Sequence, residues 1–271
     1  MLSLSKPRII VLMKQVPDMD QVEFDYEEGR IDRSSAELEP NPFDLNALEV
    51  AVQFSEQVPA EIFAVSMGPE QAESTLREAL ARGADQAVLL CDKAFAGSDT
   101  WATSSVLGAA IREIGEYDLI VCGEKTVDGD TGQVGPEVAE DLSIPHVTYV
   151  SEVESVKTDH LDIVSESWDQ MHTKRVHFPA LITVTKDVNE PRLPSFKDKM
   201  AAKKADIDTW RAEDLTTLDP DSCGIQGSPT YVADMEVPPP DKRKGNVFRD
   251  DPPQAVKKLL SELELGGISH E

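Results

Sequence analysis

The feature that most constrains the fold is a regular alternation of short apolar segments with amphipathic ones. The apolar segments are Arg8–Met13, Glu61–Ser66, Gln86–Cys91 and Asp118–Cys122, and each is typical of a buried strand. Helical spacing of apolar residues follows each of them, at 41–54, 70–82, 99–115 and 132–142. This alternation predicts an α/β fold with a doubly wound, mostly parallel, Rossmann-like sheet. Ligands of such sheets lie beyond the carboxyl ends of the strands.

The pattern changes after residue 146. Four further strand-like segments with tight connections predict added, partly antiparallel strands at Val147–Val150, His160–Val164, Lys174–His177 and Ala180–Thr185. Residues 187–200 are predicted to form a loop, because they contain Pro191 and Pro194. From residue 216 onward proline and acidic residues dominate. We therefore expect an α/β domain over residues 1–225 and an extended C-terminal arm over residues 226–271.

The arm is predicted to end in an amphipathic helix, Gln254–Leu265. Its apolar stripe consists of Val256, Leu259, Leu260, Leu263 and Leu265. Such a stripe could close the core of the chain itself. An extended arm followed by an apolar helix is more typical of a contact with another subunit, and we favour that interpretation.

A polar, glycine-rich loop follows the fourth predicted strand and leads into a helix. Gly123, Gly129 and Gly132 allow the backbone to approach a ligand closely, and Thr131 and Gln133 can donate hydrogen bonds to phosphate oxygens. The first N–H groups of a helix lack internal partners and attract anions. An ordinary strand-to-helix turn capped by threonine or aspartate would have the same spacing, so the spacing alone leaves both interpretations open.

Several motifs resemble one protein family. The loop Asp128-Gly-Asp-Thr-Gly-Gln-Val-Gly-Pro136 and the segment Ile144-Pro-His-Val-Thr-Tyr-Val150 are similar to the signature of the β subunit of electron transfer flavoproteins, especially its electron-bifurcating branch. Further motifs of that family follow in order: Val11-Leu-Met-Lys-Gln-Val16, Asn41-Pro-Phe-Asp44, Ala64-Val-Ser-Met-Gly-Pro69, Asn189-Glu-Pro-Arg192, Ala201-Ala-Lys-Lys204 and Gly224-Ile-Gln-Gly-Ser-Pro229. The resemblance covers about residues 8 to 230.

The resemblance implies an electron-carrying subunit with no catalytic residues of its own, paired with an electron transfer flavoprotein α subunit. It implies a bound FAD that accepts a hydride from NADH. One electron then goes to ferredoxin or flavodoxin, and the other goes through the FAD of the α subunit to an acyl-CoA dehydrogenase-like partner. In the non-bifurcating branch the β subunit holds AMP instead, and this alternative stays open. The strand pattern alone would also suit an ATP-binding regulatory module of the universal-stress type.

The resemblance also implies which residues contact the nucleotide. By position they are Leu12, Asn41, Pro42, Phe43, Asp44, Met67, Gly123, Glu124, Lys125, Thr126, Val127, Asp128, Gly129, Asp130, Thr131, Gly132, Gln133 and Val134. The predicted fold independently gathers the ends of the first, second and fourth strands at one edge of the sheet. Asp44 could instead be only an acid in the first turn of a helix. Asp128 and Asp130 could bind no ligand, and we favour a capping role for Asp130.

A local excess of basic residues lies between residues 192 and 204. A solvated helix face is one interpretation of it. The resemblance implies instead a recognition loop for the dehydrogenase partner, with Phe196 as its apolar anchor beside Arg192, Lys197 and Lys199.

The composition restricts the remaining classes of function. A net charge of −25 argues against binding of nucleic acid or anionic membranes. No apolar run is long enough for membrane insertion and no cleavable leader is evident, so we expect a cytoplasmic protein. The three cysteines (Cys91, Cys122 and Cys223) show no paired spacing, and the five histidines are scattered, so the sequence predicts no metal site.

Overall fold

The computed structural model describes residues 6–18, 23–25, 30–32, 37–233, 247–249 and 251–265, and the chain divides into two compact units, Met1–Asp234 and Met235–Glu271. The first unit contains the predicted α/β sheet. Within the described residues its nine strands are ordered β11-β10-β9-β12-β8-β1-β6-β7-β13. Their bounds are β1 (Arg8–Leu12), β6 (Glu61–Met67), β7 (Gln86–Leu90), β8 (Leu119–Gly123), β9 (His146–Val156), β10 (His160–Ser167), β11 (Gln170–His177), β12 (Ala180–Val184) and β13 (Asp208–Trp210).

The strand directions confirm a mostly parallel sheet with an antiparallel extension. β12, β8, β1, β6, β7 and β13 pair in parallel along the sheet. β9 is parallel to β12, and β10 and β11 then continue as antiparallel neighbours. Two small antiparallel pairs precede the first helix, β2 (Gln15–Pro17) with β5 (Leu38–Pro40) and β3 (Glu23–Asp25) with β4 (Arg30–Asp32).

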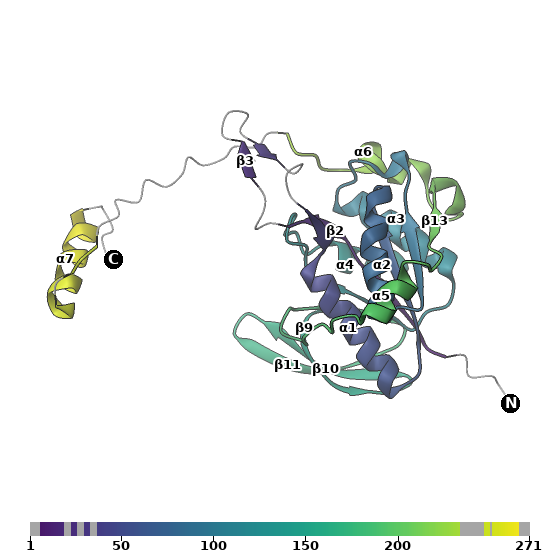
Figure 1. Cartoon of the computed structure of the whole chain (residues 1–271), viewed down its shortest axis with the longest axis horizontal. Helices are drawn as coiled ribbons and strands as arrows, with labels where there is room; N and C mark the ends of the chain where they lie inside the picture. The colour runs from purple at the N-terminus through teal and green to yellow at the C-terminus, as the bar shows by residue number, and fades with distance from the viewer. Residues whose placement is uncertain are drawn as a thin grey trace. The chain divides into compact units, whose positions relative to one another are not determined.

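Helices cover both faces of the sheet, as a doubly wound fold requires (Figure 1). α1 (Pro42–Gln57) and α2 (Glu73–Arg82) contribute Leu48, Phe54 and Leu76 to one core layer. α3 (Thr100–Ile114) and α4 (Val134–Leu142) contribute Val106 and Val138 to the other. The parallel strands are buried on both sides, which explains their nearly continuous apolar sequences.

The helix ends follow the expected local chemistry. Gly83 and Gly115 end α2 and α3 with φ of 122° and 96°. Residues that carry a side chain rarely adopt such backbone angles. Asp99 caps α3 by accepting a hydrogen bond from the N–H of Ala102. Short helical turns complete the unit: η1 (Glu70–Ala72), η2 (Lys93–Phe95), η3 (Ala212–Asp214), η4 (Pro220–Ser222) and α6 (Gly224–Gly227).

Several short elements were not predicted from the sequence, among them the strands β2 to β5, the helix α5 and the strand β13. Residues 187–200, predicted to be a loop, contain the start of α5 (Phe196–Ala202), whose N-terminus is capped by the hydroxyl of Ser195. β13 adds three residues beside β7 at the edge of the sheet. Both segments are too short for a hydrophobic period to be visible, and tertiary contacts determine their structure.

The second unit contains the predicted terminal helix, α7 (Pro252–Leu265). Val256, Leu259 and Leu260 are each about half exposed on it. The side chains of Leu263 and Leu265, which complete the predicted stripe, lie outside the described residues, as do residues 234–246 of the predicted arm.

Candidate functional site

The predicted site residues meet where the order of the parallel strands reverses. The chain leaves β1 to form β6 and β7 on one side of it, and later returns to form β8 on the other side. β1 and β8 are therefore the two strands at the topological switch point, where open α/β sheets bind ligands. Lys14 follows the end of β1 and Gly123 ends β8, and the N-terminus of α1 lies against both.

Two buried side chains of the Asn41–Asp44 motif fasten these strand ends together. The carboxylate of Asp44 accepts hydrogen bonds from the N–H groups of Lys14 (2.8 Å) and Gly123 (3.1 Å). The side chain of Asn41 donates to the carbonyl of Lys125 (2.9 Å) and accepts from the N–H of Val127 (3.2 Å). Asn41 lies at the N-cap position of α1, but its side chain fixes the glycine-rich loop and does not cap the helix.

Gly123 is required where β8 meets α1. A Cβ atom at this position would lie 2.5 Å from the Cβ of Phe43 and 2.6 Å from Oδ1 of Asp44. Any side chain would therefore push the loop away from the helix. The contact explains why glycine stands at the end of this strand and why the loop and the start of α1 form one unit.

Asp44 is a buried acid whose pKa is raised. Its side chain is enclosed, and burial raises its pKa to about 7, although the hydrogen bonds from Lys14, Asn41 and Gly123 oppose the shift. Both carboxylate oxygens are used inside the protein. The structure therefore supports a positioning role, while direct contact between Asp44 and a nucleotide stays a prediction.

This titration leads to a prediction about stability. The folded-state pKa of Asp44 lies above its unfolded value of 3.8, so its contribution is complete below about pH 4 and is lost as the pH rises through about 7. We expect the parent chain to lose its stability advantage over Asp44→Asn across that range by up to about 1.4 kcal/mol per pH unit. Denaturant unfolding of both apo chains at a series of pH values measures this difference. A difference that grows with pH would contradict the assignment.

Two ion pairs neutralise acids of the glycine-rich loop. Lys14 Nζ lies 2.7 Å from Oδ2 of Asp128, and Lys125 Nζ lies 2.8 Å from Oδ1 of Asp130. Burial alone would raise the pKa of Asp128, but hydrogen bonds from Lys14 and Thr126 outweigh it and lower the pKa. Because Asp128 and Asp130 each have a lysine ammonium group beside them, these two acids repel an approaching phosphate less than unpaired carboxylates would.

The predicted capping role of Asp130 is wrong. α4 begins at Val134 with Gln133 at its N-cap position, and no side chain caps it. Asp130 instead adopts a left-handed conformation with φ of 53°, its N–H donates to the carbonyl of Thr126 (2.9 Å), and its carboxylate pairs with Lys125. Within the part of the chain that the structure describes, the first N–H groups of α4 are thereby left without a side-chain partner, as an anion-binding helix end requires.

The loop before α4 is open to a ligand. Thr131 and Gln133 are exposed, and Gly132 has φ of 63°. Among the described residues, a Cβ at Gly129 would have one neighbour within 4 Å, the hydroxyl of Thr126 at 3.4 Å. Exposed backbone, glycine and free helix N–H groups fit a phosphate or pyrophosphate group at this position.

Cavities adjoin the remaining predicted residues. A cavity of about 750 Å³ opens beyond β6 and β7, with Met67 and Phe95 in its lining. A smaller cavity of about 240 Å³ is lined by Phe43, Glu124 and Lys125. Leu12 is buried at the end of β1, and Pro42 is exposed at the start of α1. The structure thus gathers the predicted nucleotide contacts at one edge of the sheet.

Sequence reasoning did not single out Lys14 as a site residue. Lys14 stands within the Val11–Val16 motif, directly after the strand that ends at the switch point. Its N–H binds Asp44 and its ammonium group binds Asp128. The sequence does place a basic residue directly after a central strand. Such a residue lies at the edge of the sheet where ligands bind, and this position could have marked Lys14 as a site residue.

The predicted recognition loop is held on the α/β unit by arginines. The guanidinium of Arg192 donates to Glu49 (2.8 and 2.9 Å) and to Glu56 (2.7 Å), and both acids lie on α1. Arg82 of α2 donates to the carbonyl of Arg192. Arg77, also on α2, donates to the carbonyls of residues 202 and 205 at 2.8 and 3.3 Å. We call residues 189–205 the docking segment.

The docking segment presents apolar side chains to solvent. Leu193 is 87% exposed and Phe196 is 80% exposed, and Met200 lies one helical turn after Phe196 on α5. Lys197 and Lys199 are exposed beside them. All three guanidinium nitrogens of Arg192 donate within the chain, so Arg192 holds the segment in place. Its predicted contact with a partner stays a prediction.

Comparison with known proteins gives one consistent answer. Residues 29–215 match the family described as "Electron transfer flavoprotein domain". The chain is 43% identical to the electron transfer flavoprotein subunit beta of Thermoanaerobacterium thermosaccharolyticum, over 94% of this chain and 97% of that protein. It is 40% identical to the caffeyl-CoA reductase-Etf complex subunit CarD of Acetobacterium woodii, over 86% and 88%, and 42% identical to protein FixA of Bradyrhizobium diazoefficiens, over 85% and 82%.

None of the described helices has both the length and the apolar character needed to cross a bilayer. The switch-point site, the open glycine-rich loop and the ordered motifs agree with the sequence comparisons, and the chain belongs to the electron transfer flavoprotein family as a β subunit.

Proposed function

We propose that this chain holds FAD at the switch point of its sheet and works in the cytoplasm in a complex with an electron transfer flavoprotein α subunit. When bound, the FAD would accept a hydride from NADH and supply one electron to ferredoxin or flavodoxin and one, through the α-subunit FAD, to an acyl-CoA dehydrogenase-like partner. The chain's own part is to bind, orient and electrostatically tune the cofactor.

The observation that best supports this proposal is the construction of the 123–134 loop. Its residues are partly or fully exposed, the N-cap residue Gln133 makes no side-chain cap of α4, and its acids at positions 128 and 130 are paired with lysines. Gly123 to Val134 would hold the phosphates and adjoining groups, with Asn41 and Asp44 fixing the loop from behind. Leu12 and Met67 would contact the remainder of the nucleotide from the ends of β1 and β6.

The main competing function is a non-bifurcating β subunit that holds AMP. The loop sequence Asp128-Gly-Asp-Thr-Gly-Gln-Val134, which resembles the electron-bifurcating branch of the family, favours FAD. The universal-stress alternative has no such support, because the family match extends through the docking segment.

Reduction by NADH tests the proposed donor. Anaerobic addition of NADH to the purified α–β complex should bleach the flavin absorbance of the complex. An AMP-holding β subunit has no flavin at this site, so NADH would leave the absorbance unchanged. That result would overturn the NADH-oxidising role.

We further propose that the C-terminal arm, residues 226–271, contacts the α subunit. The apolar stripe of α7 is half exposed within its own unit, and burying each leucine would contribute about 1.5–3 kcal/mol. A partner surface that covers Val256, Leu259 and Leu260 would provide this burial.

The arm proposal predicts that the α–β complex forms poorly when the stripe carries a charge. We expect Leu260→Asp to weaken assembly at least about tenfold, since a buried unpaired charge is costly. Ser261→Asp adds the same charge on the opposite side of α7 and should assemble normally. Sedimentation of the mixed subunits measures assembly. Equal assembly of the two variants would contradict the proposed contact.

A further inference from the structure

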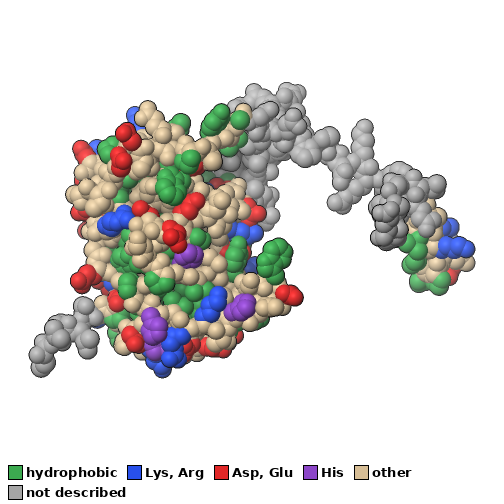
Figure 2. Space-filling view, turned by 180° about the vertical axis from the view of Figure 1, so that it is seen from behind, with side chains coloured by type: hydrophobic (Ala, Val, Ile, Leu, Met, Phe, Trp, Pro, Cys, Tyr) green, Lys and Arg blue, Asp and Glu red, His purple; other side chains and the backbone are tan. Residues whose placement is uncertain are grey.

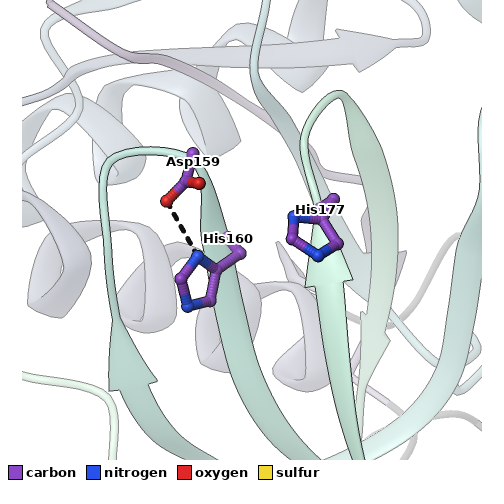
Figure 3. A group of neighbouring side chains, drawn as sticks. All are labelled: Asp159, His160 and His177. Carbon is purple, nitrogen blue, oxygen red and sulfur yellow. Dashed lines mark hydrogen bonds and ion pairs between the residues drawn. The ribbon is translucent and has the colours of Figure 1, made fainter.

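Two histidines and an aspartate that are separate in the sequence come together at one end of the antiparallel extension. Asp159 and His160 lie at the turn between β9 and β10, and His177 ends β11. His160 and His177 are directly opposite each other in the β10–β11 register. Figure 3 shows Asp159 beside His160, with His177 on the neighbouring strand, and Figure 2 shows histidine side chains at separate places on one face of the molecule.

The donor atoms of this cluster are close. One ligand atom from each of the three residues lies within 4.8 Å of the others. Nδ1 of His160 is 2.8 Å from a carboxylate oxygen of Asp159, and the two imidazole centroids are 5.5 Å apart. Imidazole nitrogen and carboxylate oxygen together form the donor set that zinc-type divalent ions bind.

The backbone beneath the cluster is fixed. The N–H of Lys157 donates to the carbonyl of His160 (3.0 Å), and the N–H of Phe178 donates to the carbonyl of Asp159 (3.1 Å). The neighbouring residues Leu161 and Val176 are buried on the opposite face of the hairpin. The His160 ring is only 15% exposed, whereas Asp159 and His177 are at the surface. Because His177 is exposed, its side chain has room to rotate toward the other two donors.

The nearby cation Arg175 is paired with an acid. Asp162 and Arg175 occupy the next position along the same face, and they pair through two hydrogen bonds of 2.7 and 3.0 Å. Asp162 thus compensates most of the positive charge of Arg175, which also acts on Asp159. The carboxylate of Asp159 is left as the negative group of the cluster.

We propose that Asp159, His160 and His177 form a binding site for a divalent zinc-type ion that is separate from the nucleotide site. Zinc ligands lie at about 2.0–2.2 Å from the ion, so a bound ion would replace the hydrogen bond between Asp159 and His160 and bring His177 closer to them. Water would complete the coordination on the exposed side. The ion would join the β9–β10 turn to β11, which is the edge strand of the sheet.

Zinc titration of the untagged, full-length chain tests this site. Calorimetry measures the affinity, and histidine-selective NMR locates the ion, because the chain has only five histidines. We expect Zn²⁺ to shift the ring signals of His160 and His177 together and to leave that of His172 unchanged.

Two variants decide the outcome. His177→Ala removes an exposed ligand and should weaken zinc binding at least about tenfold, whereas His172→Ala, on the same strand, should bind like the parent chain. The proposal is overturned if Zn²⁺ causes no coupled shift of the two rings, or if His177→Ala binds zinc as tightly as His172→Ala does.

Discussion

Replacing Gly132 with valine is expected to abolish nucleotide binding by the β subunit. Gly132 has φ of 63°, a conformation that costs an L-residue about 1–2 kcal/mol and costs a β-branched residue more. The added Cβ would also lie 3.4 Å from the carbonyl of Glu124. Relief of this strain must move the backbone of the loop that we propose for the phosphates. The expected result is a purified α–β complex that lacks the β-site flavin.

A matched variant separates this effect from general strain. Gly115→Val places the same side chain at another glycine with positive φ, 96°, at the end of α3. In the described parts of the chain, a Cβ there would have one neighbour within 4 Å, Nη1 of Arg8 at 4.0 Å, and the position is outside the proposed site. Gly115→Val should lose stability but retain its flavin. Normal flavin content in Gly132→Val, or equal loss in both variants, would refute the assignment of the loop.

Replacing Phe196 with alanine is expected to weaken electron transfer to the dehydrogenase partner. An aromatic anchor in a partner's apolar pocket often contributes 2 kcal/mol or more, which is roughly a thirtyfold effect on affinity. Phe196 is highly exposed on a segment that Arg77, Arg82 and Arg192 hold in place, so it is presented without a large ordering cost. The measurement is the partner-concentration dependence of electron transfer, with flavin content and NADH reduction as internal controls.

Met171→Ala provides the comparison for Phe196. Met171 is also an exposed apolar residue, but it lies outside the docking segment. It stands on the edge strand β11, and β13 forms the other edge of the sheet. The Met171 variant should transfer electrons at the parent rate. If Phe196→Ala did so too, or if it lost flavin, the docking segment would not be the partner surface.

The fold could be predicted because its main signals are local. Buried parallel strands such as Glu61–Met67 are almost continuously apolar, and Gly83 and Gly115 mark the helix ends. The alternation of these elements determines a doubly wound sheet. The antiparallel strands were found for the same reason, although their register depends on pairing that the sequence does not display.

The site could be predicted only in outline, because its geometry depends on contacts between distant residues. Asp44 bonds to Lys14 and Gly123, and Arg192 bonds to Glu49, over separations that no local pattern reveals. The capping role predicted for Asp130 was wrong because Lys125 offers it a closer partner. The scattered histidines predicted no metal site, yet strand register brings two of them together.

The central claim is that the β subunit holds a flavin, and the nucleotide content of the complex tests it most directly. Denaturing the purified α–β complex and quantifying the released nucleotides by chromatography requires no assumption about partners. The account predicts two FAD and no AMP per heterodimer. One FAD and one AMP per heterodimer would contradict it and would identify the chain as a non-bifurcating β subunit.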